Sequence, residues 1–317
     1  MSSDKQTSPV YVKKGMIFCM EKVSLAVPLK YRKKKRFPIL AALFLVPSVL
    51  SFVVFKYVPM LYAIFMSLFD FSIMNPPGPF VGLSNFIHLF KSSLFQTALY
   101  NTFVIALLSL VMTFWIPILQ AMLLIDIRRG NTLLRFLYLL PAAVPSIAGV
   151  LIWKWLYNPD YGLLNAILER IGLPAVGWLN DPAIAKFSLV LPGVLGGGLA
   201  VLIYYSALQG VSREIVESST IDGAGPWRRM RSIYLPGLKF IIGIQFIQFL
   251  ATAFLAFDNI YVMTGGGPAN STNVMSLMVY NSAFKQNQFG VAGAISFIIF
   301  AIVAIITFIQ IKVSNKE

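Results

Sequence analysis

Residues Glu214 to Pro236 read EIVESSTIDGAGPWRRMRSIYLP and separate two long apolar segments. Residues 217–221 favour a short helix. Asp222 to Pro226 form a strong break, because glycine accepts positive φ and proline cannot continue a helix. A second short helix is predicted from Trp227 to Tyr234, closed by Leu235-Pro236-Gly237. We therefore interpret this stretch as a helix–turn–helix loop between two membrane spans.

Basic residues gather around this loop, and they place it on the cytoplasmic side of a membrane. They are Arg213, Arg228, Arg229, Arg231 and Lys239. Two interpretations of the loop stay open on charge alone. It is a solvated loop whose bases only set the topology, or a docking element with acids before the break and bases after it.

The composition indicates a membrane protein. The chain has 317 residues, of which 57% are hydrophobic and 12% charged, and its mean hydropathy is +0.75. A soluble domain has roughly 45–50% apolar and about 25% charged residues. We therefore expect an all-α polytopic membrane protein with little room for a separate soluble domain.

Several functions are excluded by residue type. Cys19 and His88 are the single cysteine and histidine, so a disulfide framework and a cysteine or histidine metal site are excluded. No catalytic constellation and no phosphate-binding loop are visible, so we expect no metal, no cofactor and no enzyme activity in this chain. The net charge of +14 is better explained by membrane topology than by nucleic acid, because the bases lie beside apolar spans.

Six apolar segments are long enough to cross a bilayer, which takes about 20 residues. The predicted spans are 38–67, 97–124, 132–154, 187–208, 239–262 and 290–311. Ten of the 26 lysines and arginines precede the first span, which places both termini in the cytoplasm. The predicted organisation is a basic cytoplasmic tail (1–36), a six-helix transmembrane domain (37–312, with the loop at 209–238) and a short cytoplasmic tail (313–317).

Prolines and glycines interrupt three of these spans. Pro117 predicts a kink in the second, and Pro141 and Pro145 interrupt the third, which favours a helix packed within a bundle. Residues 196–198 are three consecutive glycines in the fourth span. They indicate close helix packing, which we prefer, or a break where backbone faces a pathway.

The loop resembles the EAA loop of ABC importer permeases. The residues that carry the resemblance are Glu217, then Gly223 six positions later, then Ile233, Leu235 and Pro236. Residues 221–224 and Trp227 are similar to the carbohydrate-uptake branch of that family, although Ser218 and Ser219 stand where the family usually has two alanines. Further matches are Phe80 to Phe86, Asn101-Thr102, Phe257 to Tyr261 and Thr264 to Pro268.

The resemblance implies a type I ABC importer permease with a coupling helix that docks into a separate ATPase subunit. The residues implied in coupling are Glu217, Ser218, Ser219, Asp222, Gly223, Ala224, Trp227 and Arg228. The implied partners are a second related permease, a dimer of phosphate-loop ATPases that bind ATP and Mg, an extracytoplasmic sugar-binding protein and membrane lipid, without nucleic acid. The implied location is the bacterial cytoplasmic membrane, as a multi-pass protein.

Polar side chains in the fifth span are candidates for a substrate pathway. Gln245, Gln248, Thr252 and Asn259 recur at helical spacing, and Asp258 is adjacent. Amide groups beside an aromatic ring such as Tyr261 or Tyr205 suit sugar hydroxyls, and the resemblance implies polar residues near Asp258 that contact sugar. Interhelical hydrogen bonds are the alternative role for these side chains.

The function expected is ATP-driven, binding-protein-dependent import of a carbohydrate by alternating access, with an oligosaccharide or glycoside as cargo. Two alternatives stay open. One is the same machinery with a phosphorylated polyol or an amino acid as cargo. The other is a secondary transporter that needs no ATPase, which would require buried ionisable pairs within spans, and few exist here.

Overall fold

A computed structural model describes residues 39–127 and 131–314. The predicted basic tail (1–36) and the last residues of the predicted C-terminal tail lie outside this part. The chain divides into two compact units between Ser51 and Phe52, so the helix before that point is described by itself.

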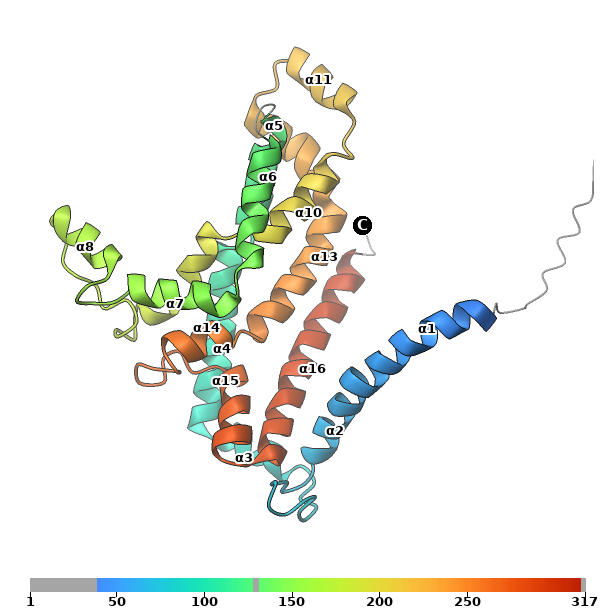
Figure 1. The fold of residues 1–317 in the computed structure, drawn as a ribbon, viewed down its shortest axis with the longest axis vertical. Coiled ribbons are helices and arrows are strands. Elements are labelled where there is room, and N and C mark those ends of the chain that lie inside the picture. Colours follow the sequence, from blue (N-terminus) through green and yellow to red (C-terminus); the bar gives the residue numbers. More distant parts are fainter. Residues whose placement is uncertain (1–38, 128–130, 315–317) are drawn as a thin grey trace, which may run out of the picture. The chain divides into compact units, whose positions relative to one another are not determined.

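The described part of the chain is helical and contains no strand (Figure 1). Its α-helices are α1 (Ile39–Phe52), α2 (Val58–Met66), α3 (Ser84–Lys91), α4 (Ser93–Met112), α5 (Ile116–Asp126), α6 (Asn131–Leu139), α7 (Ser146–Leu156), α8 (Leu163–Arg170), α9 (Ala185–Val190), α10 (Gly198–Leu208), α11 (Arg213–Ile221), α12 (Pro226–Arg229), α13 (Leu235–Phe254), α14 (Asp258–Met263), α15 (Met275–Tyr280) and α16 (Phe289–Ser314). Short 3₁₀ segments are η2 (Leu140–Ala143) and η3 (Leu191–Leu195), and π-helical turns are η1 (Val53–Tyr57), η4 (Met230–Tyr234) and η5 (Asn281–Lys285).

By length and composition, four described helical stretches can cross a membrane, and a fifth is a bent pair. They are Leu43–Met66, Ser93–Ile125, Pro226–Met263 and Phe289–Val313, with Ala185–Leu195 and Gly198–Leu208 as the pair. The predicted third span is not one helix. It divides into α6 and α7 around Pro141 and Pro145, because neither proline can donate to the helical ladder. The count of six spans therefore stays a prediction.

Two prolines follow π-helical turns. Pro59 lies in the first turn of α2, directly after η1, and Pro236 lies in the first turn of α13, directly after η4. In each case the backbone N–H just before the proline reaches back five residues, from Val58 to Val53 and from Leu235 to Met230. One inserted residue per turn thus lets the helix continue past a residue that lacks an N–H and crowds the preceding turn.

Two broken spans meet at their breaks. The chain leaves helical geometry at Thr113 to Trp115, just before the predicted kink at Pro117, and a second break separates η3 from α10 with a 46° bend. A Cβ placed on Gly193 would lie 2.8 Å from Cγ2 of Thr113, and one on Gly197 would overlap Oε1 of Gln120. The glycines at 196–198 therefore mark a break, and of these three Gly197 also permits close approach to α5, while Gly193 permits close approach to the turn before α5.

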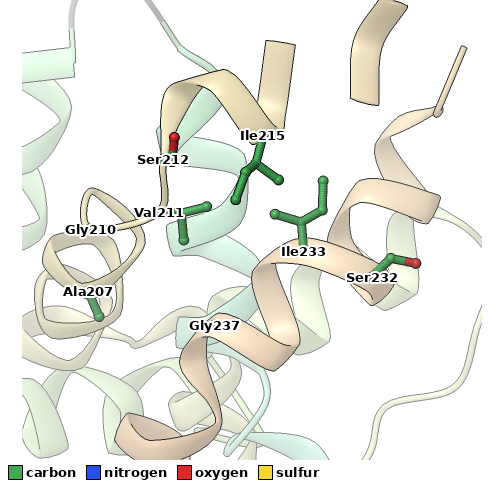
Figure 2. A pocket seen from close by; sticks show the side chains of 8 residues that line it. All are labelled: Ala207, Gly210, Val211, Ser212, Ile215, Ser232, Ile233 and Gly237. Carbon is green, nitrogen blue, oxygen red and sulfur yellow. The ribbon is translucent and has the colours of Figure 1, made fainter. Parts of the chain in front are cut away.

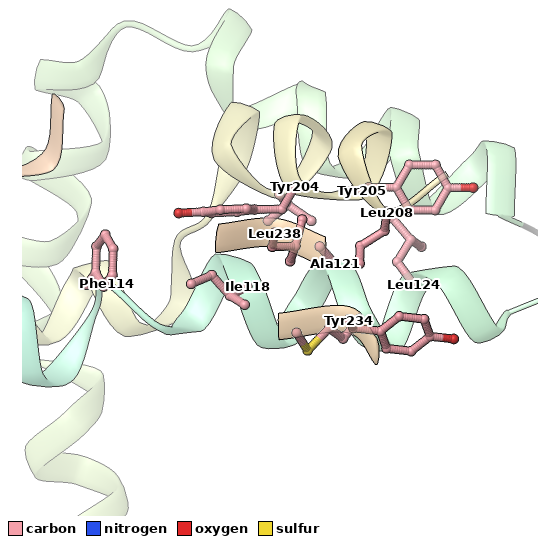
Figure 3. Close-up of a cluster of buried hydrophobic side chains, with 11 residues drawn as sticks. Phe114, Ile118, Ala121, Leu124, Tyr204, Tyr205, Leu208, Tyr234 and Leu238 are labelled. Atoms are coloured by element: carbon pink, nitrogen blue, oxygen red, sulfur yellow. The ribbon is translucent and has the colours of Figure 1, made fainter. Parts of the chain in front are cut away.

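The buried side chains form three clusters. The first joins α5, α10 and the start of α13 and is filled by Ile118, Tyr204 and Leu238, none more than 1% exposed (Figure 3). The second joins α4, α15 and α16, and the third joins α4, α9 and α14. Helix α10 packs on α5 and α13, and α16 packs on α2, α13 and α15 (Figure 1).

The motif residues Asn85 and Asn101 each bind the backbone of a distant loop, after α2 and before α15 respectively. The amide of Asn85 donates to the carbonyls of Ser67 and Phe69, at 2.8 and 3.0 Å. Asn101 is 1% exposed and donates to two carbonyls in the loop before α15. Because each buried amide satisfies two backbone acceptors, these side chains are structural cross-links between distant segments.

A second cross-link organises the segment around α8. Asn165 is 2% exposed, donates to the carbonyls of Pro159 and Val176, and accepts from the backbone of Val176 and from Nε1 of Trp178. Tyr157 packs against the same tryptophan and donates its hydroxyl to the carbonyl of Ser188 at 2.7 Å, and burial raises the pKa of this hydroxyl. The segment between α7 and α9 is therefore a folded unit and not a slack loop.

Candidate functional site

The predicted helix–turn–helix loop is present as α11 and α12. Helix α11 ends at Ile221, and Gly223 takes φ +71°, a conformation that glycine adopts without the penalty of a side chain. The backbone N–H of Ala224 donates to the carbonyl of Ser219 at 2.9 Å, which closes the end of the helix. Pro226 occupies the first turn of α12, where its missing N–H costs nothing.

The residues predicted to take part in coupling lie together on this loop. Glu217, Ser218, Asp222, Gly223, Trp227 and Arg228 are exposed, while Ser219 and Ala224 are half-buried. The hydroxyl of Ser219 donates to the carbonyl of Val216 at 2.7 Å, within the same helix. Serine in place of the expected alanine therefore satisfies its own polar group and does not hold the loop away from the body.

The loop exposes apolar side chains. Trp227 is 70% exposed, Ile221 87% and Ile215 55%. The sequence analysis named Ile221 and Trp227 for the family resemblance but did not mention Ile215, although isoleucines on a mostly polar helix beside a basic loop are a detectable signal. Large apolar side chains at the aqueous end of a membrane protein are typical of a surface that another protein covers.

Two hollows flank α11. One of about 510 Å³ is lined by Ala207, Gly210, Val211, Ser212, Ile215, Ser232, Ile233 and Gly237 (Figure 2). The other, of about 400 Å³, is lined by Glu214, Ile215, Ser218, Ser219, Asp222 and Ile233. Ile215 and Ile233 line both hollows, so α11 stands partly off the body of the protein.

The sequence had indicated that the second helix of the loop closes at Leu235-Pro236-Gly237. This prediction is wrong. Helix α12 continues through η4 into α13, so the chain is helical from Pro226 to Phe254. The π-helical turn accommodates Pro236, and Gly237 leaves room for Val211, whose Cγ2 would lie 3.3 Å from an added Cβ. The loop and the following span are thus joined without an intervening turn.

The predicted polar face of the fifth span is shorter than expected. Gln245 is half-buried, and Gln248 and Thr252 are exposed on α13. The helix ends at Phe254, so Asn259 is not on the same face and belongs with Asp258 to α14. Asp258 is exposed and Asn259 half-buried.

Tyr205 does not lie with these side chains. It is 5% exposed and belongs to the cluster that includes Tyr234 and Leu238 at the start of α13. Gln245 follows Leu238 by two helical turns, roughly 10 Å along the axis. The guanidinium of Arg135 lies 4.2 Å from the centre of the Tyr205 ring and also donates to its hydroxyl. Tyr205 of α10 therefore forms a cation–π pair with Arg135 of α6.

Aromatic rings surround α14 at the other end of α13. Phe257 stacks on Tyr261 with ring centres 5.2 Å apart, and Tyr280 lies 5.0 Å from Tyr261 and 5.4 Å from Phe284. A side-chain hydrogen bond with Tyr261 raises the pKa of Tyr280. These rings come from three segments, so their assembly could not be read from spacing in the sequence.

Residues 126–315 match the family described as binding-protein-dependent transport system inner membrane component. A trehalose/maltose transport system permease protein of Thermococcus litoralis is 33% identical over 92% of this chain and 98% of its own length. A multiple sugar-binding transport system permease protein of Streptococcus mutans is 36% identical over 86% of this chain and 93% of its own length.

A solved structure shares the fold. It is a bacterial alginate ABC transporter in complex with an alginate pentasaccharide-bound periplasmic protein. The matched chain superposes with a TM-score of 0.78 over 88% of this chain and 94% of its own, at 22% identity.

Proposed function

Because the chain belongs to the family of binding-protein-dependent transport system inner membrane components, we propose that it is the permease subunit of an ATP-driven importer for a carbohydrate, an oligosaccharide or a glycoside. It is a multi-pass inner membrane protein and a transport subunit. Relatives that transport trehalose, maltose and multiple sugars, matched over nearly their whole length, support a carbohydrate cargo.

The exposed α11–α12 loop is the observation that carries this proposal. Its tip presents Ile221 and Trp227 beside Asp222 and Arg228, so apolar contact and charge pairing are available to the same partner. In the proposed machine this partner is one of two ATPase subunits, which bind ATP and Mg. Their closure would move α12 and α13 together and expose the pathway to the outer side.

Two further partners complete the proposed importer. A second, related permease would supply the other half of the pathway, since the described long apolar helices leave broad apolar faces exposed. An extracytoplasmic sugar-binding protein would deliver the cargo. Gln248 and Thr252 offer neutral donors and acceptors of the kind that sugar hydroxyls need.

The alternatives are less well supported. A phosphorylated cargo would call for arginine or lysine beside the polar positions of α13, and between Gln245 and Asn259 there is neither. A secondary transporter driven by ions would call for ionisable pairs within the spans, and it gives no role to the exposed loop.

The first experiment is mild detergent extraction from the native membrane, followed by mass spectrometry of co-purifying proteins. We expect a phosphate-loop ATPase and a second permease with the wild-type chain. Asp222→Arg and Gly223→Pro should lose the ATPase and sugar uptake while the chain remains in the membrane. Asp160→Arg, which changes an exposed aspartate outside the loop, is the matched control and should retain both.

Two outcomes would contradict the proposal. If Asp222→Arg keeps its ATPase and imports sugar normally, the loop is not the docking element. If the wild-type chain purifies alone and moves solute into vesicles without ATP, a secondary transporter replaces the importer.

A further inference from the structure

The α14–α15 aromatic cluster consists of Phe257, Tyr261, Tyr280 and Phe284. Neighbouring ring centres lie 5.0–5.4 Å apart. The rings of Phe257 and Tyr261 are the most nearly parallel, with an interplanar angle of 16°. Such spacing holds the rings against one another as a rigid surface. It does not bury them, because Phe284 is 71% exposed and Tyr261 39%.

Charged groups border the same surface. The ammonium of Lys285 lies 5.7 Å from the ring centre of Tyr261 and 5.8 Å from that of Tyr280, within the range of cation–π attraction. Asp258 follows Phe257 directly in the chain and is exposed. The cluster thus combines flat apolar faces, two phenol hydroxyls, a cation with free hydrogen-bonding capacity and a carboxylate.

The position of the cluster is set by α13. The helix runs about 30 Å from the α11–α12 end to Phe254 at a rise of 1.5 Å per residue, and α14 follows three residues later (Figure 1). If α11 faces the cytoplasm, the cluster lies at the outer end, adjoining Asp258 and Asn259. A cargo would reach these rings before it reached Gln248.

We propose that the α14–α15 aromatic cluster is an outer subsite that receives a neutral pyranose unit of the cargo by stacking it on Tyr261 and Phe284, with Lys285 and Asp258 contacting hydroxyls. This inference rests on the carbohydrate cargo of the proposed function. A pyranose ring has an apolar C–H face and a rim of hydroxyls, which matches flat rings bordered by polar groups.

Lipid is a poorer fit for this surface. The exposed parts of α1 and α16 mix leucine, isoleucine and valine with single phenylalanines, as acyl chains require. The cluster instead consists of four aromatic rings with the Lys285 ammonium over two of them, and the exposed Asp258 is next to Phe257 in the chain. Charged side chains facing hydrocarbon would be costly, so an aqueous occupant is favoured.

The test uses cells that express the whole transporter and a mixture of neutral di-, tri- and pentasaccharides of glucose, galactose and N-acetylglucosamine. Internalised sugars are identified by mass spectrometry, and uptake kinetics are then measured for the sugar that enters. Tyr261→Leu and Phe284→Leu keep apolar volume but remove the flat face. Phe308→Leu, at a 67% exposed position of α16, is the matched control.

We expect both cluster variants to raise KM for uptake by roughly 3- to 10-fold with little change in maximal rate, as loss of an aromatic contact predicts. Phe284→Tyr and Tyr261→Phe keep the flat aromatic face, so each of these variants should have a KM near that of the wild type. Phe308→Leu should leave KM unchanged.

Three outcomes would overturn the inference. Equal KM values for the cluster variants and Phe308→Leu would mean that the rings do not hold sugar. Loss of the second permease on purification, with unchanged KM, would make the cluster a subunit contact. If cells with the wild-type transporter take up no more sugar than cells that lack this chain, the proposed carbohydrate cargo is wrong, and the proposed subsite is wrong with it.

Discussion

The side-chain amide of Asn101 lies 2.9 Å from the backbone carbonyl of Asn273, 172 positions later in the chain. The same amide donates to the carbonyl of Asn270, also at 2.9 Å, and the hydroxyl of the next residue, Thr102, accepts from the backbone N–H of Met275. Helix α4 therefore fixes the loop that leads into α15. This contact explains the Asn101-Thr102 motif as a structural one.

Asn101→Leu should destabilise the protein by about 1–3 kcal/mol, because two buried carbonyls lose their donor. The measurement is the thermal midpoint of the detergent-solubilised chain, combined with proteolysis of the 264–275 loop. Gln96→Leu is the control, since Gln96 lies on the same helix and its amide donates to Phe90 at an exposed site. Equal effects of the two changes would contradict a structural role for Asn101.

Gly197→Ala should destabilise more than Gly198→Ala. Both residues have positive φ, at +135° and +42°, but an added Cβ meets Gln120 only at Gly197, and Gly198 faces open space. Strain at Gly198 should cost about 1–2 kcal/mol. Adding Gln120→Ala to Gly197→Ala should recover part of the loss in the unfolding midpoint. No recovery would assign the loss to backbone strain and to the contact of the new Cβ with Cγ2 of Val201 at 2.8 Å.

Arg135→Lys should weaken the contact between α6 and α10. The Arg135 guanidinium lies over the Tyr205 ring and also donates to its hydroxyl, whereas a lysine ammonium cannot do both in the same way. The expected loss is about 0.5–2 kcal/mol, and a double-mutant cycle with Tyr205→Phe isolates the hydroxyl's share. Arg170→Lys, on the exposed end of α8, should change nothing.

Asn165→Leu should open the segment around α8 while the rest of the chain stays folded. The amide satisfies three backbone groups and the indole of Trp178, so its removal leaves buried polar atoms unpaired. Trypsin should then cut at Arg170 faster than in the wild type. Asn180→Leu, at an exposed position of the same segment, is the control, and equal cleavage rates would refute the assignment.

The local chemistry of the α11–α12 loop was readable from sequence. Glycine and proline act on the backbone where they stand, so Gly223 and Pro226 predict the break between the two helices without knowledge of the fold. Apolar length likewise predicts α4, α13 and α16. The same reasoning was wrong at Pro236, because a π-helical turn one residue longer than expected keeps the helix intact.

The break after Phe254 could not have been predicted, because its cause is distant in the chain. Residues 255–257 are Leu-Ala-Phe, which carry no breaking signal. The carbonyl of Ala256 instead accepts from the hydroxyl of Ser276 at 2.5 Å, a contact made only in the folded protein. That hydrogen bond lies just beyond the end of α13, and Asn259 belongs to α14, off the face of Gln248. The aromatic cluster escaped the sequence for the same reason.

Unbroken helical backbone from Pro226 to Phe254 makes the outer surface of the α11–α12 loop and the polar face of α13 parts of one rod. A rotation of the helix at Trp227 is therefore transmitted to Gln248 through continuous hydrogen-bonded turns, because no loop separates them. The angle about the helix axis between the side chains of Trp227 and Gln248 depends on the single extra residue in η4. Deleting one residue there would turn everything beyond it by about 100°, so the length of that turn, as much as any side chain, determines where the polar face of α13 points.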